Sequence, residues 1–224
     1  MPRIADHEER RRQIAGAVCG LISEQGLDTV TVARTAAAAG MSVGLVQHYF
    51  RTKDDMLLHA FKEVSARIRG RAEERIRAGT EHRLPIARVM AEVMAEFLPL
   101  DEARRAEFRV SRAFAGRALD APALARVDAE TAARMREDFA RAVHNGKECG
   151  EVDPDLDPWP AAVRLTAVTE GLAMQVYRES TGPAPAGAAE PSAAALSASV
   201  IATELAAVFT GECRQYAERP TSGL

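Results

Sequence analysis

Residues 31–57, TVARTAAAAGMSVGLVQHYFRTKDDML, decide the fold of this chain. Thr31 precedes an alanine-rich run that ends at Gly40, and Ser42 precedes a second short run that reaches Tyr49. Threonine and serine favour the N-cap of a helix, and glycine often ends one because it adopts left-handed backbone. The stretch therefore predicts two short helices joined by a tight turn, one between Thr31 and Gly40 and one between Ser42 and Tyr49.

The second short helix has an apolar face and a face suited to a ligand. Val46 and Phe50 fall on one side and are expected to point inward, which leaves four side chains facing outward: Val43, Leu45, Gln47 and His48. A helix fits the major groove of DNA, which is about 12 Å wide. Gly44 costs roughly 1 kcal/mol relative to alanine inside a helix. We expect its benefit to be a close approach of the backbone to DNA.

An earlier helix completes a three-helix unit. Asp6 and Glu9 form a capping-box pattern, and Gly26 is expected to end the helix. Between them, apolar side chains recur on one helical face at Ile14, Val18, Leu21 and Ile22. Three helices with a tight turn before the third are what a helix-turn-helix requires.

This motif resembles the TetR family of bacterial regulators over residues 8–60. The matching positions are Ile14, Ala17, Gly26, Thr31-Val32, Thr35-Ala36, Ala39-Gly40-Met41-Ser42, Gly44, Tyr49-Phe50 and Lys53. Two departures stand out. Thr35 replaces the usual Ile or Leu, so its hydroxyl needs a partner such as the carbonyl one turn back. Gln47 and Val43 stand where Tyr and Lys are common, so the operator need not be that of a typical relative.

Side-chain chemistry gives the expected DNA contacts. Gln47 suits the adenine edge, Val43 and Leu45 suit thymine methyl groups, and His48 suits bases or phosphates. The residues suited to phosphates are Thr31, Ser42, Tyr49 and Lys53. Two alternatives stay open: Tyr49 also suits core packing, and the arginines at 10–12 suit either DNA attraction or a solvated face. An inert, exposed Gln47 is the less favoured interpretation.

Charge and cysteine spacing limit the function classes. The formal net charge is −3, yet residues 1–80 carry 13 Lys and Arg against 10 Asp and Glu, and the remainder is acidic. A basic front suits an anionic partner, although such an imbalance is also ordinary surface variation. Cys19, Cys149 and Cys213 lie far apart in the sequence, so their spacing predicts neither a disulfide framework nor a zinc site.

No targeting or membrane segment is expected. The charged N-terminus lacks the apolar core of a secretion signal, and no run approaches the roughly 18 apolar residues of a membrane span. We therefore expect a soluble, cytoplasmic protein without a membrane partner.

Beyond the helix-turn-helix, the pattern predicts an all-α chain of about nine helices. The later helices are expected at 53–79, 86–97, 102–117, 121–147, 160–179 and 193–216, with a loop at 151–160 and a Pro/Gly/Ala tract at 181–192. Pro85 is expected at the first helical position, and Asn145-Gly146 near a helix end. The expected domains are 1–52 for DNA binding, with a fourth helix that starts there and continues to about 68, and 53–224 for effector binding and dimerisation.

The C-terminal part, including GEVDPDLDPWPAAVRLTAVTEGLAMQVY at 150–177, resembles the betaine-regulator-like branch of the family. That resemblance implies a ligand cavity among the middle helices and a homodimer seam along the helices near 160–180 and 193–216. The residues favour the seam, since mostly apolar side chains recur there: Val163, Leu165, Val168, Leu172, Met174, Gln175 and Val176, then Leu196, Val200, Ile201, Leu205 and Val208. The alternative is that all of them are internal core.

The ligand cavity is expected to use adaptable, aromatic and polar residues: Met90, Met94, Phe97, Phe108, Arg109, Arg112, Glu170, Met174 and Tyr177. Methionines also fill core gaps, and such polar residues are often exposed or paired. A choline-type ligand needs an aromatic cage, and with aromatics at 5% of the chain we do not expect that ligand.

The sequence thus predicts a ligand-responsive repressor that binds a pseudo-palindromic operator in double-stranded DNA as a homodimer and responds to a small-molecule effector. An activator, or a regulator without an effector, fits the same pattern. An enzyme is disfavoured because no HExxH motif, Gly-rich phosphate loop or nucleophile elbow occurs, and His144 with Cys149 is the nearest approach to a catalytic pair. No catalytic residue, metal ligand or cofactor is expected.

Overall fold

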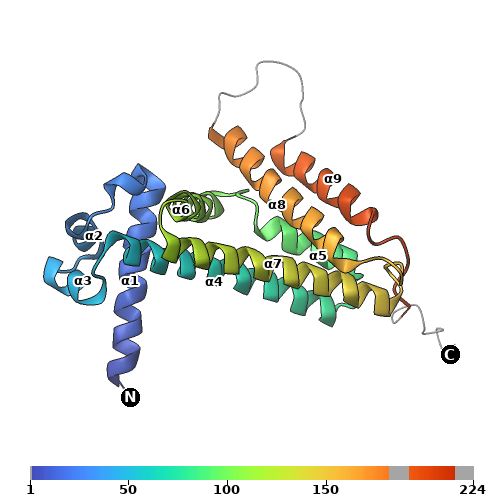
Figure 1. Ribbon diagram of the computed structural model, residues 1–224, viewed down its shortest axis with the longest axis horizontal. Helices are drawn as coiled ribbons and strands as arrows, with labels where there is room; N and C mark the ends of the chain where they lie inside the picture. Colours follow the sequence, from blue (N-terminus) through green and yellow to red (C-terminus); the bar gives the residue numbers. More distant parts are fainter. Residues whose placement is uncertain (1, 182–191, 215–224) are drawn as a thin grey trace, which may run out of the picture. The chain divides into compact units, whose positions relative to one another are not determined.

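The computed structural model describes residues 2–181 and 192–214, with side chains described from His7 onward (Figure 1). These residues form nine α-helices and a short 3-10 helix: α1 (Pro2–Gln25), η1 (Leu27–Thr29), α2 (Val32–Ala39), α3 (Val43–Tyr49), α4 (Lys53–Glu81), α5 (Ile86–Glu96), α6 (Glu102–Ala118), α7 (Pro122–Cys149), α8 (Pro158–Thr181) and α9 (Ala193–Ala206). Their one extended pairing is an isolated bridge between Val152 and Phe209. The prediction of an all-α fold is confirmed.

The chain divides into two compact units. The first unit comprises residues 1–68 and 101–130, and the second comprises 69–100 and 131–224. The long helices α4 and α7 each contribute to both units. The domain boundary expected after residue 52 stays a prediction. The two compact units do not follow that boundary, since α6 and the start of α7 pack with the N-terminal helices.

The first unit is held together by an apolar core. α1 packs against α2 and α6, and buried side chains from these helices and α4 form one cluster. At its centre the rings of Phe61 and Phe114 stack with centroids 3.9 Å apart and an interplanar angle of 3°. Ile14, Val46 and Leu57 belong to the same cluster and are completely buried. This core fixes α2 and α3 against α1.

The second unit packs α9 against both α5 and α8, and Figure 1 shows α8 and α9 side by side. Met94 and Leu165 are completely buried within it. α4 and α5 approach closely, since a Cβ added at Gly79 would lie 2.3 Å from a methyl carbon of Val89. A side chain at position 79 would therefore force Val89 to move.

Several predicted helix ends need correction. α1 begins at Pro2, well before the expected cap at Asp6, and proline is tolerated at a first helical position. Pro85 has extended backbone (ψ 145°) and is the N-cap of α5, so the helix begins one residue later. α9 ends at Ala206 instead of Tyr216, because the chain leaves the helix to bury Val208 and Phe209.

Gly146 does not end α7 as expected. The helix continues to Cys149, and a Cβ at Gly146 would lie 2.6 Å from a methyl carbon of Val152 and 2.9 Å from the ring of Phe209. This glycine serves close packing inside a helix. The Pro/Gly/Ala tract expected at 181–192 lies almost wholly outside the described residues.

Candidate nucleic-acid interface

Helices α2 and α3 begin and end where the local sequence predicts. The Thr31 hydroxyl accepts a hydrogen bond from the Arg34 amide at 3.2 Å, and the Ser42 hydroxyl accepts one from the Leu45 amide at 3.2 Å. Gly40 has left-handed backbone, with φ 64° and ψ 34°, and ends α2. These three features confirm the predicted N-caps and the tight turn.

The turn is fixed to the rest of the first unit. The Met41 amide donates to the Ala36 carbonyl at 2.9 Å, and the Gln13 side chain on α1 donates to the Ala39 carbonyl at 2.9 Å. Ala36 and Ala39 are buried, whereas Ala37 and Ala38 are exposed. Small side chains at 36 and 39 therefore allow the close packing of α2.

α3 presents an exposed face, as expected. Val46 and Phe50 point into the core with at most 2% of their surface exposed. The exposed residues are Ser42, Val43, Gly44, Gln47 and His48, while Leu45 and Tyr49 are half-buried. No neighbouring atom lies within 4 Å of where a Gly44 Cβ would be. The lack of a side chain there leaves the α3 backbone open to a ligand.

Tyr49 is both packed and accessible. Its ring lies 4.7 Å from the His7 ring and 5.4 Å from the His48 ring, centroid to centroid, and it packs beside the apolar core. The two interpretations of this residue are therefore compatible.

The start of α4 carries a capping box that the sequence analysis missed. The Asp55 amide donates to the Thr52 hydroxyl at 3.0 Å, and the Thr52 amide donates to the Asp55 carboxylate at 3.1 Å. The Thr-x-x-Asp spacing was the available signal. This capping box places half-buried Lys53 at the first position of α4.

Thr31, another predicted phosphate contact, is exposed at the start of α2.

Arg117 joins α6 to α4 next to this cap. Its Nε and Nη2 each donate to a carboxylate oxygen of Asp54 at 3.0 Å. The Arg117–Asp54 pair lines an open hollow, together with Lys53 and Asp28. The Asp54 carboxylate neutralises the charge of Arg117, and Lys53 is the other cation among the described residues that line this hollow.

Thr35 corrects one expectation. Its side chain is completely buried on α2, and its hydroxyl has no hydrogen-bond partner among the described residues. The expected bond to a carbonyl one turn back is absent there. A buried, unpaired hydroxyl costs stability, because it loses its bonds to water.

The arginines at 10–12 have different surroundings. Arg12 pairs with Glu9 at 2.7 Å, and the guanidinium of Arg11 lies 5.2 Å from the centroid of the Phe50 ring. Arg10 is exposed. Arg11 packs on Phe50. Whether the three arginines attract DNA or only form a solvated face stays open.

Comparison with known proteins decides the family. The family model described as "BetI-type transcriptional repressor, C-terminal" matches residues 85–206, more than half of the chain. The model described as "Bacterial regulatory proteins, tetR family" matches residues 16–60. The chain belongs to the TetR family. It is a DNA-binding transcriptional regulator, and the prediction that it is not an enzyme is confirmed by the regulators among its relatives.

Two curated relatives share sequence with this TetR-family chain. The HTH-type transcriptional regulator PksA of Bacillus subtilis is 29% identical over 190 residues, which cover 78% of this chain and 82% of PksA. BetI of Cronobacter sakazakii is 33% identical over 88 residues, 38% of this chain and 44% of BetI. The BetI match thus spans less than half of that protein.

Solved structures share the fold. A transcriptional regulator from Rhodococcus sp. Rha1 has a TM-score of 0.72 and 27% identity, covering 89% of this chain and 96% of that one. A regulator from Saccharomonospora viridis, solved in complex with choline, has a TM-score of 0.67 and 22% identity, covering 88% and 94%. No helix among the described residues of this TetR-family chain combines the length and apolarity of a membrane span.

The predicted ligand residues are distributed over both units. In the second unit Met90 and Met94 are buried, Phe97 packs edge-to-face on Phe139 with centroids 6.5 Å apart, and three others are half-buried or exposed: Met174, Tyr177 and Glu170. In the first unit Phe108 and Arg109 are half-buried and Arg112 is exposed. Their role stays a prediction, and the exposure of Glu170 and Arg112 makes these two the weaker candidates.

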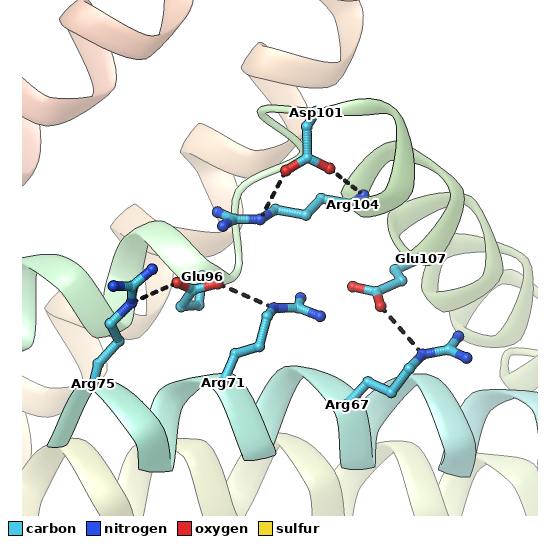
Figure 2. Close-up of polar contacts among 7 residues, drawn as sticks. All are labelled: Arg67, Arg71, Arg75, Glu96, Asp101, Arg104 and Glu107. Atoms are coloured by element: carbon cyan, nitrogen blue, oxygen red, sulfur yellow. Dashed lines mark hydrogen bonds and ion pairs between the residues drawn. The ribbon is translucent and has the colours of Figure 1, made fainter. Parts of the chain in front are cut away.

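Charged groups near the predicted ligand residues form pairs that the sequence analysis missed. Figure 2 shows Glu96 between two arginines of the second unit: the Nε of Arg71 lies 3.0 Å and that of Arg75 2.8 Å from its carboxylate oxygens. In the first unit Arg67 pairs with Glu107 at 3.2 Å. The spacing of the arginines, one turn apart along α4, was the available signal.

Asp101 begins α6 and is also shown in Figure 2. Its carboxylate accepts the Arg104 amide at 2.8 Å and lies 3.2 Å from the Nε of the same residue. This N-cap fixes where α6 starts, within the first unit.

The predicted seam residues separate into two sets. Many are buried inside the second unit: Leu165, Leu172, Val176, Ile201, Leu205 and Val208. Val163, Leu196 and Val200 are 43%, 44% and 39% exposed, respectively. The internal-core interpretation holds for the first set, and an outward apolar face remains on the second.

Cys149 and Cys213, distant in sequence, are neighbours in the second unit. The Cys149 thiol donates to the Gly146 carbonyl and to Glu151, each at 3.4 Å. Burial raises its pKa to about 11. A hydrogen bond from the Glu151 backbone lowers this pKa, whereas the Glu151 carboxylate and the Cys213 thiol raise it. His144 instead lies exposed beside Glu148 at 3.7 Å. The His144–Cys149 pair considered from the sequence is therefore not formed.

Proposed function

We propose that this chain is a ligand-responsive repressor that binds a pseudo-palindromic operator as a homodimer. The observation that carries the proposal is α3, a short helix with buried Val46 and Phe50 behind it and exposed Val43, Gln47 and His48 in front. Such a helix suits the major groove, where polar and apolar side chains read base edges. Its place of action is then the bacterial cytoplasm, where chromosomal DNA lies.

The proposed contacts divide by chemistry. Gln47 reads an adenine, Val43 and Leu45 contact thymine methyl groups, and His48 contacts a base or a phosphate. Phosphates are bound by residues at helix starts and at the rim of α3: Thr31, Ser42, Tyr49 and Lys53. The open backbone at Gly44 supports a close approach to the duplex.

Selection of bound duplexes from a random pool tests this function. We expect two half-sites with centres about 34–36 Å apart, one turn of DNA, because a dimer presents two copies of α3. A purified chain that enriches no sequence and binds no duplex at low salt would refute the proposal.

The outward apolar face of α8 and α9 supports the homodimer. Val163, Leu196 and Val200 are exposed together with small residues, and a salt bridge of 2.6 Å between Arg164 and Glu204 connects the two helices. Two copies of this helix pair form a four-helix bundle that covers the apolar side chains.

A single charge tests that seam. Val200→Glu places a carboxylate on the proposed interface, so sedimentation should show monomers and operator affinity should fall. Leu119→Glu is the matched control, because Leu119 is 87% exposed in the first unit. A Val200→Glu protein that sediments as a wild-type dimer would refute this seam.

The effector is proposed from two lines of support. The BetI-type model matches the C-terminal part, and a structurally similar regulator was solved with choline. Relief of repression then requires a ligand that binds the DNA-free conformation better than the DNA-bound one. Release of the operator by members of a metabolite library tests this, with choline as one probe. DNA binding without release by any compound, or transcription that falls when the gene is deleted, favours the alternatives of no effector and of an activator.

A further inference from the structure

Three potential metal ligands meet in the second unit, where the end of α7 contacts the segment after α9. Cys149 is the last residue of α7, Glu151 follows in the next loop, and Cys213 lies beyond α9. Their sulfur and oxygen atoms all lie within 4.8 Å of one another. A tetrahedral zinc ion holds two sulfurs about 3.8 Å apart, given Zn–S distances near 2.3 Å. Small side-chain rotations therefore bring the three groups to coordination distance.

The backbone holds the two segments in place. Val152 pairs with Phe209 in an antiparallel bridge, and the Gly211 amide donates to the Glu151 carbonyl at 2.9 Å. A Cβ at Gly211 would lie 2.2 Å from the carbonyl oxygen of Gly150, so only glycine permits this approach. These backbone contacts therefore place the Cys213 thiol, two residues after Gly211, beside Cys149 and Glu151.

The Glu151 carboxylate is buried without a cation. It is 1% exposed, and it accepts the amides of Ile86 and Ala87, at the start of α5, at 2.9 and 3.1 Å. Among the residues that the structure describes, no ion pair within 4.0 Å joins it to Lys, Arg or His; the side chain of Arg214 lies beside the neighbouring Gly150 instead. The amides at the start of α5 and the Cys149 thiol already stabilise this anion, and a bound cation would add a favourable charge in place of the thiol proton. The two amides also orient the carboxylate, as outer-shell groups do at metal sites.

We propose that Cys149, Glu151 and Cys213 form a binding site for a thiophilic divalent cation, with zinc as the best fit. Two sulfurs and one carboxylate oxygen suit a borderline-soft ion, whereas magnesium and calcium prefer oxygen ligands alone. Binding displaces the thiol protons to solvent, so both cysteines bind as thiolates. Cys213 is only half-buried, which gives the ion an entry path and leaves a fourth position for water.

Cobalt titration of the full-length, metal-stripped and reduced protein tests the site. We expect one equivalent of Co²⁺ per chain to produce a thiolate-to-cobalt charge-transfer band and the visible bands of a tetrahedral ion. Zinc should abolish these bands, and an excess of magnesium or calcium should not. A wild-type protein without the charge-transfer band would overturn the proposal whatever the variants do.

A pair of cysteine variants locates the ion. Cys213→Ser should lose at least half of the charge-transfer band, because it removes one of two thiolates from a half-buried position. Cys19→Ser is the matched control, since this third cysteine lies on α1 in the first unit, and it should keep the full band. Zinc should raise the unfolding temperature of the wild type and of Cys19→Ser, and not that of Cys213→Ser.

Two results contradict this assignment. One is a full band in Cys213→Ser, which would place the ion elsewhere. The other is a Cys149–Cys213 pair that oxidises to a disulfide in air and gives no band after reduction, which would assign the pair to thiol–disulfide chemistry. Neither result concerns operator binding, so the proposed function stands or fails separately.

Discussion

The two units bury their polar groups to different extents. Among the described residues of the first unit, the buried polar ones are Thr35 and Glu107, and the core is a continuous apolar cluster around the stacked Phe61 and Phe114. In the second unit two carboxylates are almost fully buried: Glu96 meets two arginines, and Glu151 caps α5.

This difference predicts which substitutions each unit tolerates. Apolar packing is tolerant of what lies at the surface, so the first unit can vary the exposed face of α3 without losing its fold. Buried carboxylates depend on particular donors at particular distances, so the second unit should tolerate few changes at those positions. The following predictions test this contrast, from the largest expected effect to the smallest.

Removing the stacked ring of the first unit should be the most damaging change. Phe114→Ala deletes a completely buried side chain, so we expect the free energy of unfolding to fall by about 3–5 kcal/mol. Denaturant unfolding at fixed protein concentration measures this loss. Leu119→Ala, at the C-cap of α6 with 87% exposure, is the control and should change stability by less than about 0.5 kcal/mol.

Removing a buried carboxylate tests the second unit. Glu96→Ala removes the carboxylate that Arg71 and Arg75 contact, and we expect a loss of about 2–3 kcal/mol, since both arginines keep partial access to solvent. Arg88→Ala breaks an exposed pair with Glu92 and should cost less than about 1 kcal/mol. Equal losses for the two variants would show that the buried Glu96 pairs contribute no more to stability than the exposed Arg88–Glu92 pair of the same unit.

Changing the reading face should affect binding and spare the fold. Gln47→Ala should weaken binding to the cognate operator by about 1–3 kcal/mol and relax preference at one base pair, with unchanged unfolding. Fluorescence anisotropy on cognate and random duplexes measures the difference. The same loss on random DNA would count against direct readout.

The unpaired hydroxyl of the first unit predicts a gain. Thr35→Val keeps the shape of the side chain and removes a buried oxygen without a partner, so stability should rise by about 1 kcal/mol. The control is Thr169→Val on α8, where the hydroxyl donates to the Leu165 carbonyl at 2.8 Å, and no gain is expected. A loss at position 35 would indicate that the hydroxyl is satisfied in solution.

The smallest effect concerns one phosphate contact. Lys53→Ala should weaken binding to all sequences alike and reduce the slope of log K against log salt by about 1. Lys62→Ala, an exposed lysine further along α4, should leave the slope unchanged. If both variants have the wild-type slope, Lys53 does not bind phosphate.

The helix-turn-helix could be predicted from the sequence almost residue by residue. The cap at Thr31, the left-handed Gly40 and the cap at Ser42 are each decided by contacts within four residues. Patterns of that length are visible in the sequence itself. The burial of Val46 and Phe50 followed from helical periodicity in the same way.

The second unit could not be predicted to that depth. Its periodicity indicated apolar helices but not which face each one buries, so seam and core residues were grouped together. The end of α9 was also missed, because Val208 and Phe209 gain more from burial beside Val152 than from another helical turn.

Sequence by itself determined the helical class, the capped helix-turn-helix and the outward face of α3, because all three depend on neighbours within one or two turns. Tertiary structure alone decided that Glu96 lies between two arginines, that Glu151 caps α5, and that Cys149 meets Cys213. Those contacts join residues far apart along the chain. Their partners are selected by how helices pack, and one sequence pattern is compatible with many such packings.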